Sequence, residues 1–249
     1  VIGDDTSGQI FKNELVKKGI SPEYLIVDKN RHTTRKTRVI AHNQQVVRID
    51  RETRNPIDEK EELALLEMFD KLVDNVDGII ISDYFKGVIT EKVAQGIVER
   101  GKKRGKFVSV DPKEKHFQYF KGVSIITPNQ KEAGLIVGEK LVSDDDVYEA
   151  GKRILNMLGS GAVLIKRGEK GMTLFENSGT ITNLPTVARE VYDVTGAGDT
   201  VIAVLTAASV AGANLKESAL ISNYAAGIIV GQLGTAAVTI DQLKEAILN

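Results

Sequence analysis

From about residue 60 onward, apolar residues alternate between two patterns, one with the period of a helix and one of short unbroken runs. Leu63, Leu66 and Phe69 recur near the spacing of one helix face, which predicts a helix over 61–75. Further helices are expected at 90–103, at 144–158 and at the end of the chain. The unbroken runs predict strands at 78–82, 107–110, 123–126 and 162–165, and a hairpin at 172–175 and 180–184. This alternation predicts a doubly wound, mainly parallel α/β sheet with helices on both faces.

The segment 33–50 has a different pattern. Two β-prone runs, 37–41 and 45–49, are joined by residues 42–44, a reasonable turn. Both runs contain many more polar side chains than the core strands. We therefore expect a small β-hairpin that stands off the main sheet, as a lid or an oligomer contact.

Composition narrows the function classes. The 249 residues fit one large α/β domain or two small ones, and the formal net charge of −1 gives no general field for nucleic acid or an anionic membrane. The absence of cysteine excludes disulfides, thiolate metal sites and a cysteine nucleophile, and is compatible with a reducing cytoplasm. No apolar run reaches the roughly 18 residues of a membrane helix. We expect a cytoplasmic protein with small-molecule partners, no nucleic acid and no membrane.

The most informative segment is 193–200, which reads Asp-Val-Thr-Gly-Ala-Gly-Asp-Thr and leads directly into the apolar run 201–210. A glycine-flexible turn before a helix forms an anion site, because backbone N–H groups and the helix dipole point at one spot. A carboxylate repels an anionic ligand there unless it has a chemical task, such as taking a proton from a nucleophile. Asp199 in this turn therefore suggests phosphoryl transfer to a hydroxyl group.

Asn129 and Glu132 follow the strand predicted at 123–126 and lie three residues apart at a helix start. Their oxygens could bind hydrated Mg²⁺, which prefers few protein ligands and several waters. The alternative is a capping pair, with Asn129 as N-cap and Glu132 reaching back to it. The aspartate in the glycine turn favours the magnesium interpretation.

Ligands of parallel sheets bind beyond the carboxyl ends of the strands, and three more polar segments follow such ends. The segment 166–171 has cations and glycines that suit a nucleotide phosphate, although a plain β-turn explains the glycines equally well. The segments 83–87 and 111–113 each place an acid and a lysine at a strand end, with helix capping by the aspartate as the alternative. Small residues at 222–227 indicate either a flat slot for a purine or tight helix packing.

Several other segments resemble known functional motifs only in part or lack them. The segment 96–103 has P-loop spacing, but Lys103 replaces the required Ser or Thr and the segment is helical. No G-x-G-x-x-G follows a strand, which argues against a dinucleotide-dependent dehydrogenase. The three histidines lack metal-ligand spacing, and there is no G-x-S-x-G.

The turn 193–200 resembles the C-terminal signature of the pfkB, or ribokinase-like, sugar kinases, and residues 129–132 resemble their N-x-x-E magnesium motif. The order and spacing of strands and motifs agree over essentially the whole chain. The resemblance implies a single ribokinase-like kinase domain over 1–249 that uses ATP and Mg²⁺, with K⁺ as a further cation, to phosphorylate a sugar hydroxyl.

The same resemblance implies roles for individual residues. Asp199 would be the general base that draws the proton from the sugar hydroxyl. The backbone N–H groups of Gly196, Ala197 and Gly198 would hold the charge on the transferred group. The remaining roles are ATP binding by Lys166, Gly168, Gly171, Asn223 and Gly227, Mg²⁺ binding by Asn129 and Glu132, and K⁺ binding by Asp193 and Thr195.

Within that family, the segments 33–45, 82–87 and 111–113 are similar to the kinase domain of the bacterial heptose kinases. Those enzymes phosphorylate D-glycero-β-D-manno-heptose 7-phosphate at O1, on the way to ADP-heptose for lipopolysaccharide. Glu114 departs from the glycine expected in that subfamily. The family's first strand and its glycine-rich sugar-binding segment should precede Val1, so we interpret the chain as N-terminally truncated, and a fused adenylyltransferase is expected in the full-length protein.

The hairpin at 33–50 would then cover the sugar. Its cations and hydrogen-bonding groups suit a phosphorylated, hydroxyl-rich substrate, and the alternative is a solvated strand face. Related kinases pair such lids across a homodimer. The candidate substrate residues are Lys36, Arg38, Asn43 and Gln44. Another pfkB-type activity, on ribose, fructose or a fructose phosphate, and a non-catalytic nucleotide-binding fragment remain the alternative functions.

Overall fold

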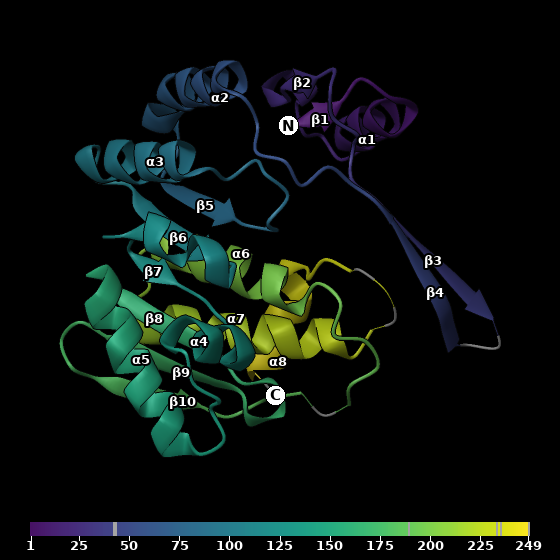
Figure 1. Cartoon of the computed structure of the whole chain (residues 1–249). Coiled ribbons are helices and arrows are strands. Elements are labelled where there is room, and N and C mark those ends of the chain that lie inside the picture. Colours follow the sequence, from purple (N-terminus) through teal and green to yellow (C-terminus); the bar gives the residue numbers. More distant parts are fainter. Residues whose placement is uncertain (42–43, 189, 233, 235, 249) are drawn as a thin grey trace. The chain divides into compact units, whose positions relative to one another are not determined.

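The computed structural model describes residues 1–41, 44–188, 190–232, 234 and 236–248 (Figure 1). The chain divides into two compact units, one of Val1–Leu72 and Phe85–Val93 and one of Val73–Tyr84 and Ala94–Asn249. The single kinase domain predicted over 1–249 stays a prediction, because compactness does not show whether the two units act as one.

The larger unit is built on a six-stranded sheet with the strand order β10-β9-β8-β7-β6-β5 (Figure 1). Strands β5, β6, β7 and β8 are parallel to one another. Strand β9 is antiparallel to both of its neighbours, β8 and β10. This is the mainly parallel sheet that the apolar runs predict. The strands are β5 (Gly78–Ser82), β6 (Phe107–Asp111), β7 (Ile125–Ile126), β8 (Ala162–Lys166), β9 (Met172–Glu176) and β10 (Ile181–Leu184).

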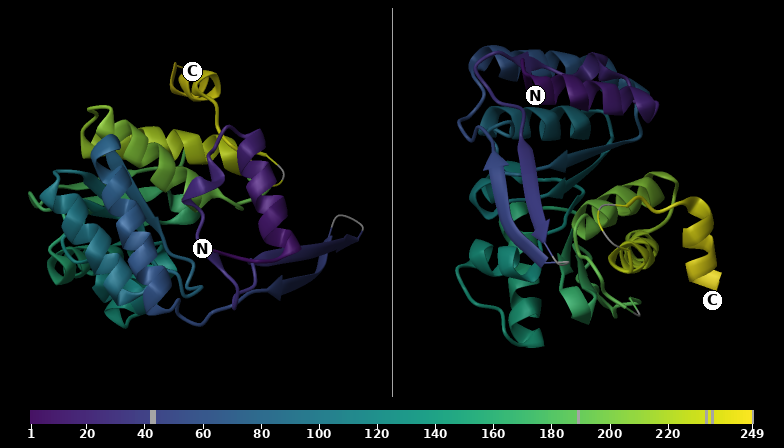
Figure 2. Two further views of the ribbon diagram at one scale, coloured as in Figure 1. Left: turned by 90° about the horizontal axis from the view of Figure 1, so that it is seen from above. Right: turned by 90° about the vertical axis from the view of Figure 1, so that its right-hand side faces the viewer.

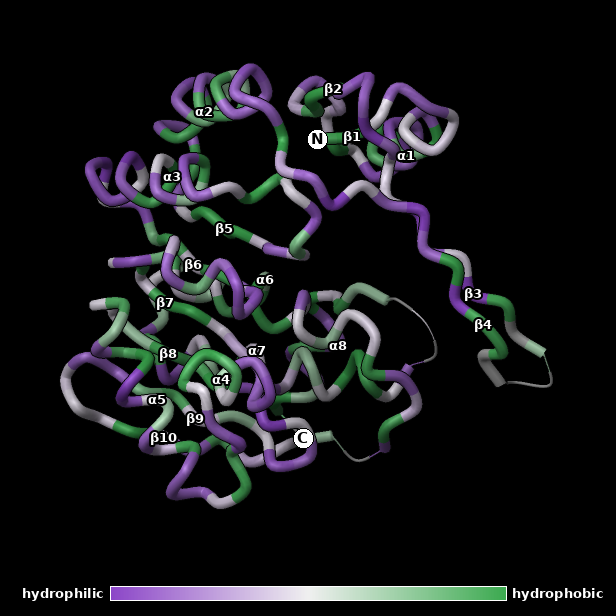
Figure 3. The backbone as a smooth tube through the Cα atoms, in the orientation of Figure 1, coloured by the Kyte–Doolittle hydropathy of each residue, from purple (hydrophilic) through white to green (hydrophobic). Residues whose placement is uncertain are grey.

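Helices cover both faces of this sheet, as predicted. Helices α6 and α7 pack against one face, and α4 and α5 against the other (Figure 2). The core between them is apolar, with Ile125, Leu164 and Leu205 fully buried, and the strands accordingly include many hydrophobic positions (Figure 3). The helices are α3 (Glu91–Lys103), α4 (Gln130–Val137), α5 (Asp144–Leu158), α6 (Ala197–Val210), α7 (Leu215–Val230) and α8 (Ile240–Leu248), with 3₁₀ turns at Val73–Asn75, Glu114–Phe120 and Gly168–Lys170.

The strand predicted at 123–126 is shorter in the structure, where β7 is limited to Ile125–Ile126. The backbone still bonds on either side of β7, since Ser124 N–H donates to the carbonyl of Val108 and Thr127 N–H to that of Val110, at 2.9 Å each. The parallel ladder therefore holds the segment that leads to Asn129 in place. No helix among the described residues is long and apolar enough to cross a membrane.

In its first part, the smaller unit contains a helix and two short strands that the apolar pattern does not predict. Strands β1 (Ile2–Gly3) and β2 (Val27–Asp28) form a parallel pair, with α1 (Thr6–Lys17) and a 3₁₀ turn at Pro22–Tyr24 between them. Helix α2 (Glu59–Leu72) follows later. The guanidinium of Arg31, almost fully buried, donates to the carbonyls of Thr53, Asn55 and Lys86 at 2.7–3.1 Å and so connects three segments of this unit.

The hairpin lies where the sequence predicts one, as the antiparallel pair β3 (Arg35–Ala41) and β4 (Gln44–Arg51). It extends away from the helices of its own unit (Figures 1 and 3). The register places Val39 opposite Val47 and Thr37 opposite Ile49, so three apolar side chains share one face. Val39, Val47 and Ile49 are 42%, 45% and 58% exposed.

The turn after β8 depends on Gly171, which gives a stability prediction. Gly171 has φ +81°, and a Cβ there would lie 2.0 Å from the carbonyl oxygen of Leu184. We expect Gly171→Ala to lower the free energy of unfolding by about 3 kcal/mol or more, because backbone cannot give way as a flexible side chain can. Gly179 is the matched control, since it has φ +89° and nothing within 4 Å of its Cβ position. Gly179→Ala should cost only about 1 kcal/mol in the same urea titration, and equal losses at both glycines would contradict the clash.

Candidate functional site

The candidate site is at the start of α6, where the glycine turn enters the helix. Gly196 is the N-cap with φ +85°, and no side chain caps the helix. The N–H of Ala197 donates to the carbonyl of Val194 at 3.2 Å, so this one amide already has a protein partner. A helix N-terminus without a side-chain cap leaves first-turn N–H groups and the positive end of the dipole for an anion.

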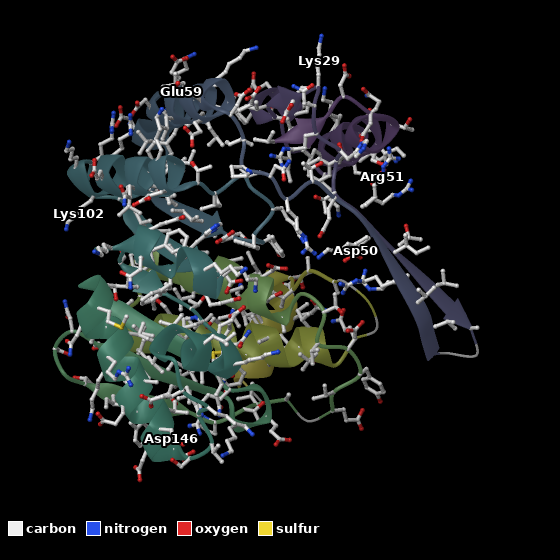
Figure 4. All side chains as sticks on the ribbon, in the orientation of Figure 1. Lys29, Asp50, Arg51, Glu59, Lys102 and Asp146 are labelled. Atoms are coloured by element: carbon white, nitrogen blue, oxygen red, sulfur yellow. The ribbon has the colours of Figure 1, made fainter. Side chains whose placement is uncertain are left out.

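Asp199 differs from the other acids at its position in a helix. Glu132, Asp146 and Glu217 are each the third residue of a helix, and each reaches back to the backbone N–H of its N-cap in a capping box. Asp146, at the start of α5, is labelled in Figure 4. Asp199 is also the third residue of its helix, but its N-cap is a glycine and the carboxylate makes no capping bond. Capping therefore does not explain this acid.

The carboxylate of Asp199 instead meets the side chain of Tyr84, which follows β5. The phenol of Tyr84 donates to Asp199 Oδ1 at 2.5 Å, across 115 residues of sequence. Burial, followed by the hydrogen bond and the charge of Asp199, raises the pKa of Tyr84 from 10.0 to about 12. The phenol therefore stays a hydrogen-bond donor throughout the neutral range.

This shifted pKa predicts a pH dependence of stability. The folded-state pKa of Tyr84 lies above the unfolded value, so the stability linked to it is fully present below pH 10.0 and is lost as the pH rises toward about 12. We expect the difference in unfolding free energy between the wild type and Tyr84→Phe to shrink across that interval. Denaturant titrations at several alkaline pH values measure it, and a difference that stays constant from pH 10 to 12 would contradict the bond.

Lys166, at the end of β8, lies beside the glycine turn. A Cβ built on Gly198 would be 3.2 Å from its Nζ, which places the ammonium at the first turn of α6. The same Nζ donates to Asp111 Oδ1 at 2.6 Å, and Thr127 donates to that oxygen at 3.1 Å. Both charged side chains are about 15% exposed. A lysine paired with an acid next to an uncapped helix start can exchange that acid for a phosphate oxygen.

Asn129 and Glu132 form the capping box that was the alternative to a magnesium site. Asn129 Oδ1 accepts from the N–H of Glu132, and Glu132 Oε2 accepts from the N–H of Asn129, at 2.9 Å each. Glu132 Oε1 pairs with the ammonium of Lys113. Burial alone would lower the pKa of Lys113, but the hydrogen bond and charge of Glu132 raise it overall. Both carboxylate oxygens thus have protein partners, and the described residues include no group of three or more His, Cys, Asp or Glu side chains that could hold a metal.

Asp193, at the start of the glycine turn, accepts two backbone hydrogen bonds. Its Oδ1 accepts from the N–H of Thr195 at 2.9 Å, and its Oδ2 accepts from the N–H of Gly234 at 3.2 Å. The carboxylate therefore ties the turn to the segment after α7. Asp193 and Thr195 are the predicted K⁺ neighbours, and the structure brings them together in one turn.

The five predicted ATP residues line one cavity of about 570 Å³, which also borders the glycine turn. Lys166 and Gly198 belong to its lining, and α7 contributes Asn223, Ala226, Gly227 and Val230. The amide of Asn223 donates to the carbonyl of Pro185 at 2.7 Å, which commits one of its donors to the loop before the turn. The predicted residues among the cavity lining are Asn129, Lys166, Gly168, Gly171, Ala197, Gly198, Asn223 and Gly227.

The predicted substrate residues belong to the smaller unit, whereas Asp199 belongs to the larger one. Lys36 and Arg38 lie on β3, on the face of the hairpin opposite to the apolar one. Gln44 begins β4. Asn43 lies outside the described residues. Their role in sugar binding stays a prediction.

Sequence reasoning assigned no role to Tyr84, Asp111 and Lys113, which the structure places at the site. The sequence contains an indication of these residues, because the segments 83–87 and 111–113 follow the carboxyl ends of parallel strands, where ligands bind. A second acid there, the buried Asp83, bonds to His116 Nδ1 at 2.7 Å.

Known proteins resemble this chain over nearly its whole length. The sequence model of the pfkB family carbohydrate kinases matches residues 1–242. The chain is 41% identical over 247 residues to the bifunctional protein HldE of Paramagnetospirillum magneticum, and 38% identical over 249 residues to that of Syntrophotalea carbinolica. These alignments cover 99% and 100% of the chain but 51% of each relative. The chain thus spans about half the length of the curated relatives that it matches.

Solved structures give the same fold. Phosphofructokinase-2 from Escherichia coli, in complex with potassium, superposes with a TM-score of 0.82 at 18% identity, over 99% of this chain and 79% of that one. Ribokinase from Arabidopsis thaliana, complexed with ribose and ATP, gives 0.78 at 20% identity, over 99% and 80%. The predicted ribokinase-like fold is confirmed.

Proposed function

We propose that this chain, which belongs to the pfkB family of carbohydrate kinases, transfers the γ-phosphoryl group of ATP to O1 of D-glycero-β-D-manno-heptose 7-phosphate. The sugar is supported by identities of about 40% to proteins named bifunctional HldE, and by the three segments that resemble bacterial heptose kinases. The product would feed ADP-heptose and lipopolysaccharide synthesis.

One observation supports the chemistry above all others: Asp199 is an exposed acid at the third position of α6 that takes no part in capping. Asp199 lies in the first turn of α6, where N–H groups without a side-chain cap are available to an anion. A base next to an anion site is the combination that in-line phosphoryl transfer to a hydroxyl requires.

In the proposed mechanism Asp199 accepts the proton of the sugar hydroxyl as its oxygen attacks the γ-phosphorus. The N–H groups at Gly196, Ala197 and Gly198 stabilise the charge on the transferred group, with the Ala197 amide released from Val194. Lys166 moves from Asp111 to the phosphate oxygens and orients them. The remaining ATP residues hold the nucleotide in the cavity that they line, with Asn223 and Gly227 beside the adenine.

Magnesium fits the pair of Asn129 and Glu132 as a water-separated ion. Glu132 has both oxygens engaged by protein donors, so direct coordination by this carboxylate would require Lys113 or the N–H of Asn129 to leave. Asn129 and Glu132 would therefore hold hydrated Mg²⁺ through water, as its reluctance to dehydrate favours. When bound, Mg²⁺ neutralises charge on the phosphates. Asp193 and Thr195 would lie beside K⁺, and the likeness to a potassium complex of phosphofructokinase-2 supports testing that ion.

The hairpin is proposed to serve both as a lid and as a dimer contact. Lys36, Arg38, Asn43 and Gln44 would contact the phosphorylated sugar. The exposed apolar face of Val39, Val47 and Ile49 supports pairing with a second copy of the chain. The full-length protein is proposed to have a fused adenylyltransferase, in line with relatives twice as long that are named bifunctional, and to be cytoplasmic.

A panel of acceptors tests the substrate. ADP release should be fastest with the heptose 7-phosphate, and ribose, fructose and fructose 6-phosphate serve as the competing acceptors. Fastest turnover with one of these would replace the heptose by that sugar. Binding of Mg·ATP without turnover of any acceptor, measured by calorimetry, would instead support a non-catalytic nucleotide-binding fragment.

A further inference from the structure

We propose that Tyr84 is a positioning residue for the catalytic base: its phenol holds Oδ1 of Asp199 and leaves Oδ2 to take the proton from the acceptor hydroxyl. This inference rests on the proposed function, since it assumes that Asp199 is the base. Neither residue pattern nor local spacing indicates the pair, because the two residues lie 115 positions apart.

The contact is the principal restraint on the carboxylate. Among the described residues, Tyr84 donates to the Asp199 side chain, at 2.5 Å. The comparable acids of α4, α5 and α7 are fixed by capping bonds, which Asp199 lacks. Rotation of a carboxylate about its last bond is soft, so an acid without a second contact would sample many orientations. One short, charge-assisted hydrogen bond selects one orientation.

The donor suits this task. The raised pKa keeps the phenol protonated over the working pH range, so it can donate to the carboxylate continuously. Tyr84 also follows the carboxyl end of β5, which the parallel ladder with β6 fixes. Its ring therefore projects from a rigid element toward the start of α6.

The backbone next to Tyr84 gives independent support. Phe85 has φ +54°, the one left-handed non-glycine residue in the part of the chain that the structure describes. A bulky residue rarely adopts this conformation, and such strain concentrates where a functional geometry must be kept. The strained residue adjoins the tyrosine that contacts the base.

A double-mutant cycle measures the coupling. We expect Tyr84→Phe to lower kcat about 10- to 100-fold while the KM for ATP is unchanged, because the base is misoriented and the nucleotide is untouched. In the Asp199→Asn background, Tyr84→Phe should cause no further loss. Losses that multiply in the double variant would overturn the inference, as would a Tyr84→Phe enzyme with normal kcat and reduced thermal stability.

Tyr148→Phe is the matched control. Tyr148, like Tyr84, has its hydroxyl in a side-chain hydrogen bond, accepting from Asn183 at 2.7 Å, and it lies on α5 outside the proposed site. Its removal should leave kcat and both KM values unchanged. A similar loss of kcat in this control would assign the effect of Tyr84→Phe to general destabilisation and overturn the inference.

A second measurement is independent of any sugar and of the stability of Tyr84→Phe. Protein labelled with ¹³C at tyrosine Cζ should give six signals, one for each tyrosine of the chain. The Tyr84 signal is assigned by its absence in Tyr84→Phe, or by substituting each of the other five tyrosines by phenylalanine in turn. This signal should shift in Asp199→Asn and stay in place in Asp146→Asn. An unshifted signal would overturn the contact, whereas a wild type without turnover of any acceptor would overturn the proposed function and leave this result standing.

Discussion

Asp199→Asn is expected to lower kcat at least about 10²-fold while the protein stays folded and binds ATP with its normal affinity. Asparagine has nearly the same shape but cannot accept the proton of the acceptor hydroxyl. The substitution also replaces no capping bond, because Asp199 makes none, so the fold has little reason to change. Steady-state ADP release and calorimetric ATP titration measure the two parts of this prediction.

Asp146→Asn provides the control for that experiment. Asp146 is the same residue type at the same position of another helix, where it accepts from the N–H groups of Val142 and Ser143 at 2.8 Å. These bonds keep its pKa below the usual range. The control should lose stability at neutral pH and keep its kcat. Near-normal turnover by Asp199→Asn would remove Asp199 from the role of base.

Lys166→Met is expected to lower kcat/KM for ATP about 10²-fold, the second large effect. The ammonium lies at the first turn of α6, and its removal would deprive phosphates bound there of a cation. Lys166→Arg should retain part of the activity, because a guanidinium keeps the charge with altered geometry. Kinetics at saturating sugar phosphate and varied ATP measure the effect.

Two further variants separate binding from stability. Lys166→Met leaves Asp111 without its cation in a mostly buried place, so the double variant Lys166→Met/Asp111→Asn, which removes both charges, should recover stability but not kcat/KM. Lys170→Met is the control within the same turn, since Lys170 is 52% exposed and lies 3.6 Å from Asp144. An equal loss of kcat/KM at Lys170 would contradict a specific contact of Lys166 with the phosphates.

The larger elements follow from the sequence where the apolar pattern is regular. The strand 78–82 and the helix 144–158 have the predicted bounds, since apolar runs and helical periods are local patterns. The prediction fails to include α1, whose apolar side chains are mostly exposed and give little periodic signal. It overextends the strand at 123–126, because regular pairing depends on the neighbouring strands.

The sequence by itself determined the doubly wound fold, the family resemblance and the glycine turn with its unexplained acid. These properties depend on period, order and spacing along the chain. Only the tertiary structure decided that Glu132 caps its helix and pairs with Lys113, whereas Asp199 caps nothing and meets Tyr84. The physical reason is that identical helix positions acquire different partners: the reciprocal capping box needs an N-cap side chain, which Gly196 lacks, and the partner of Asp199 comes from the end of a strand 115 residues away.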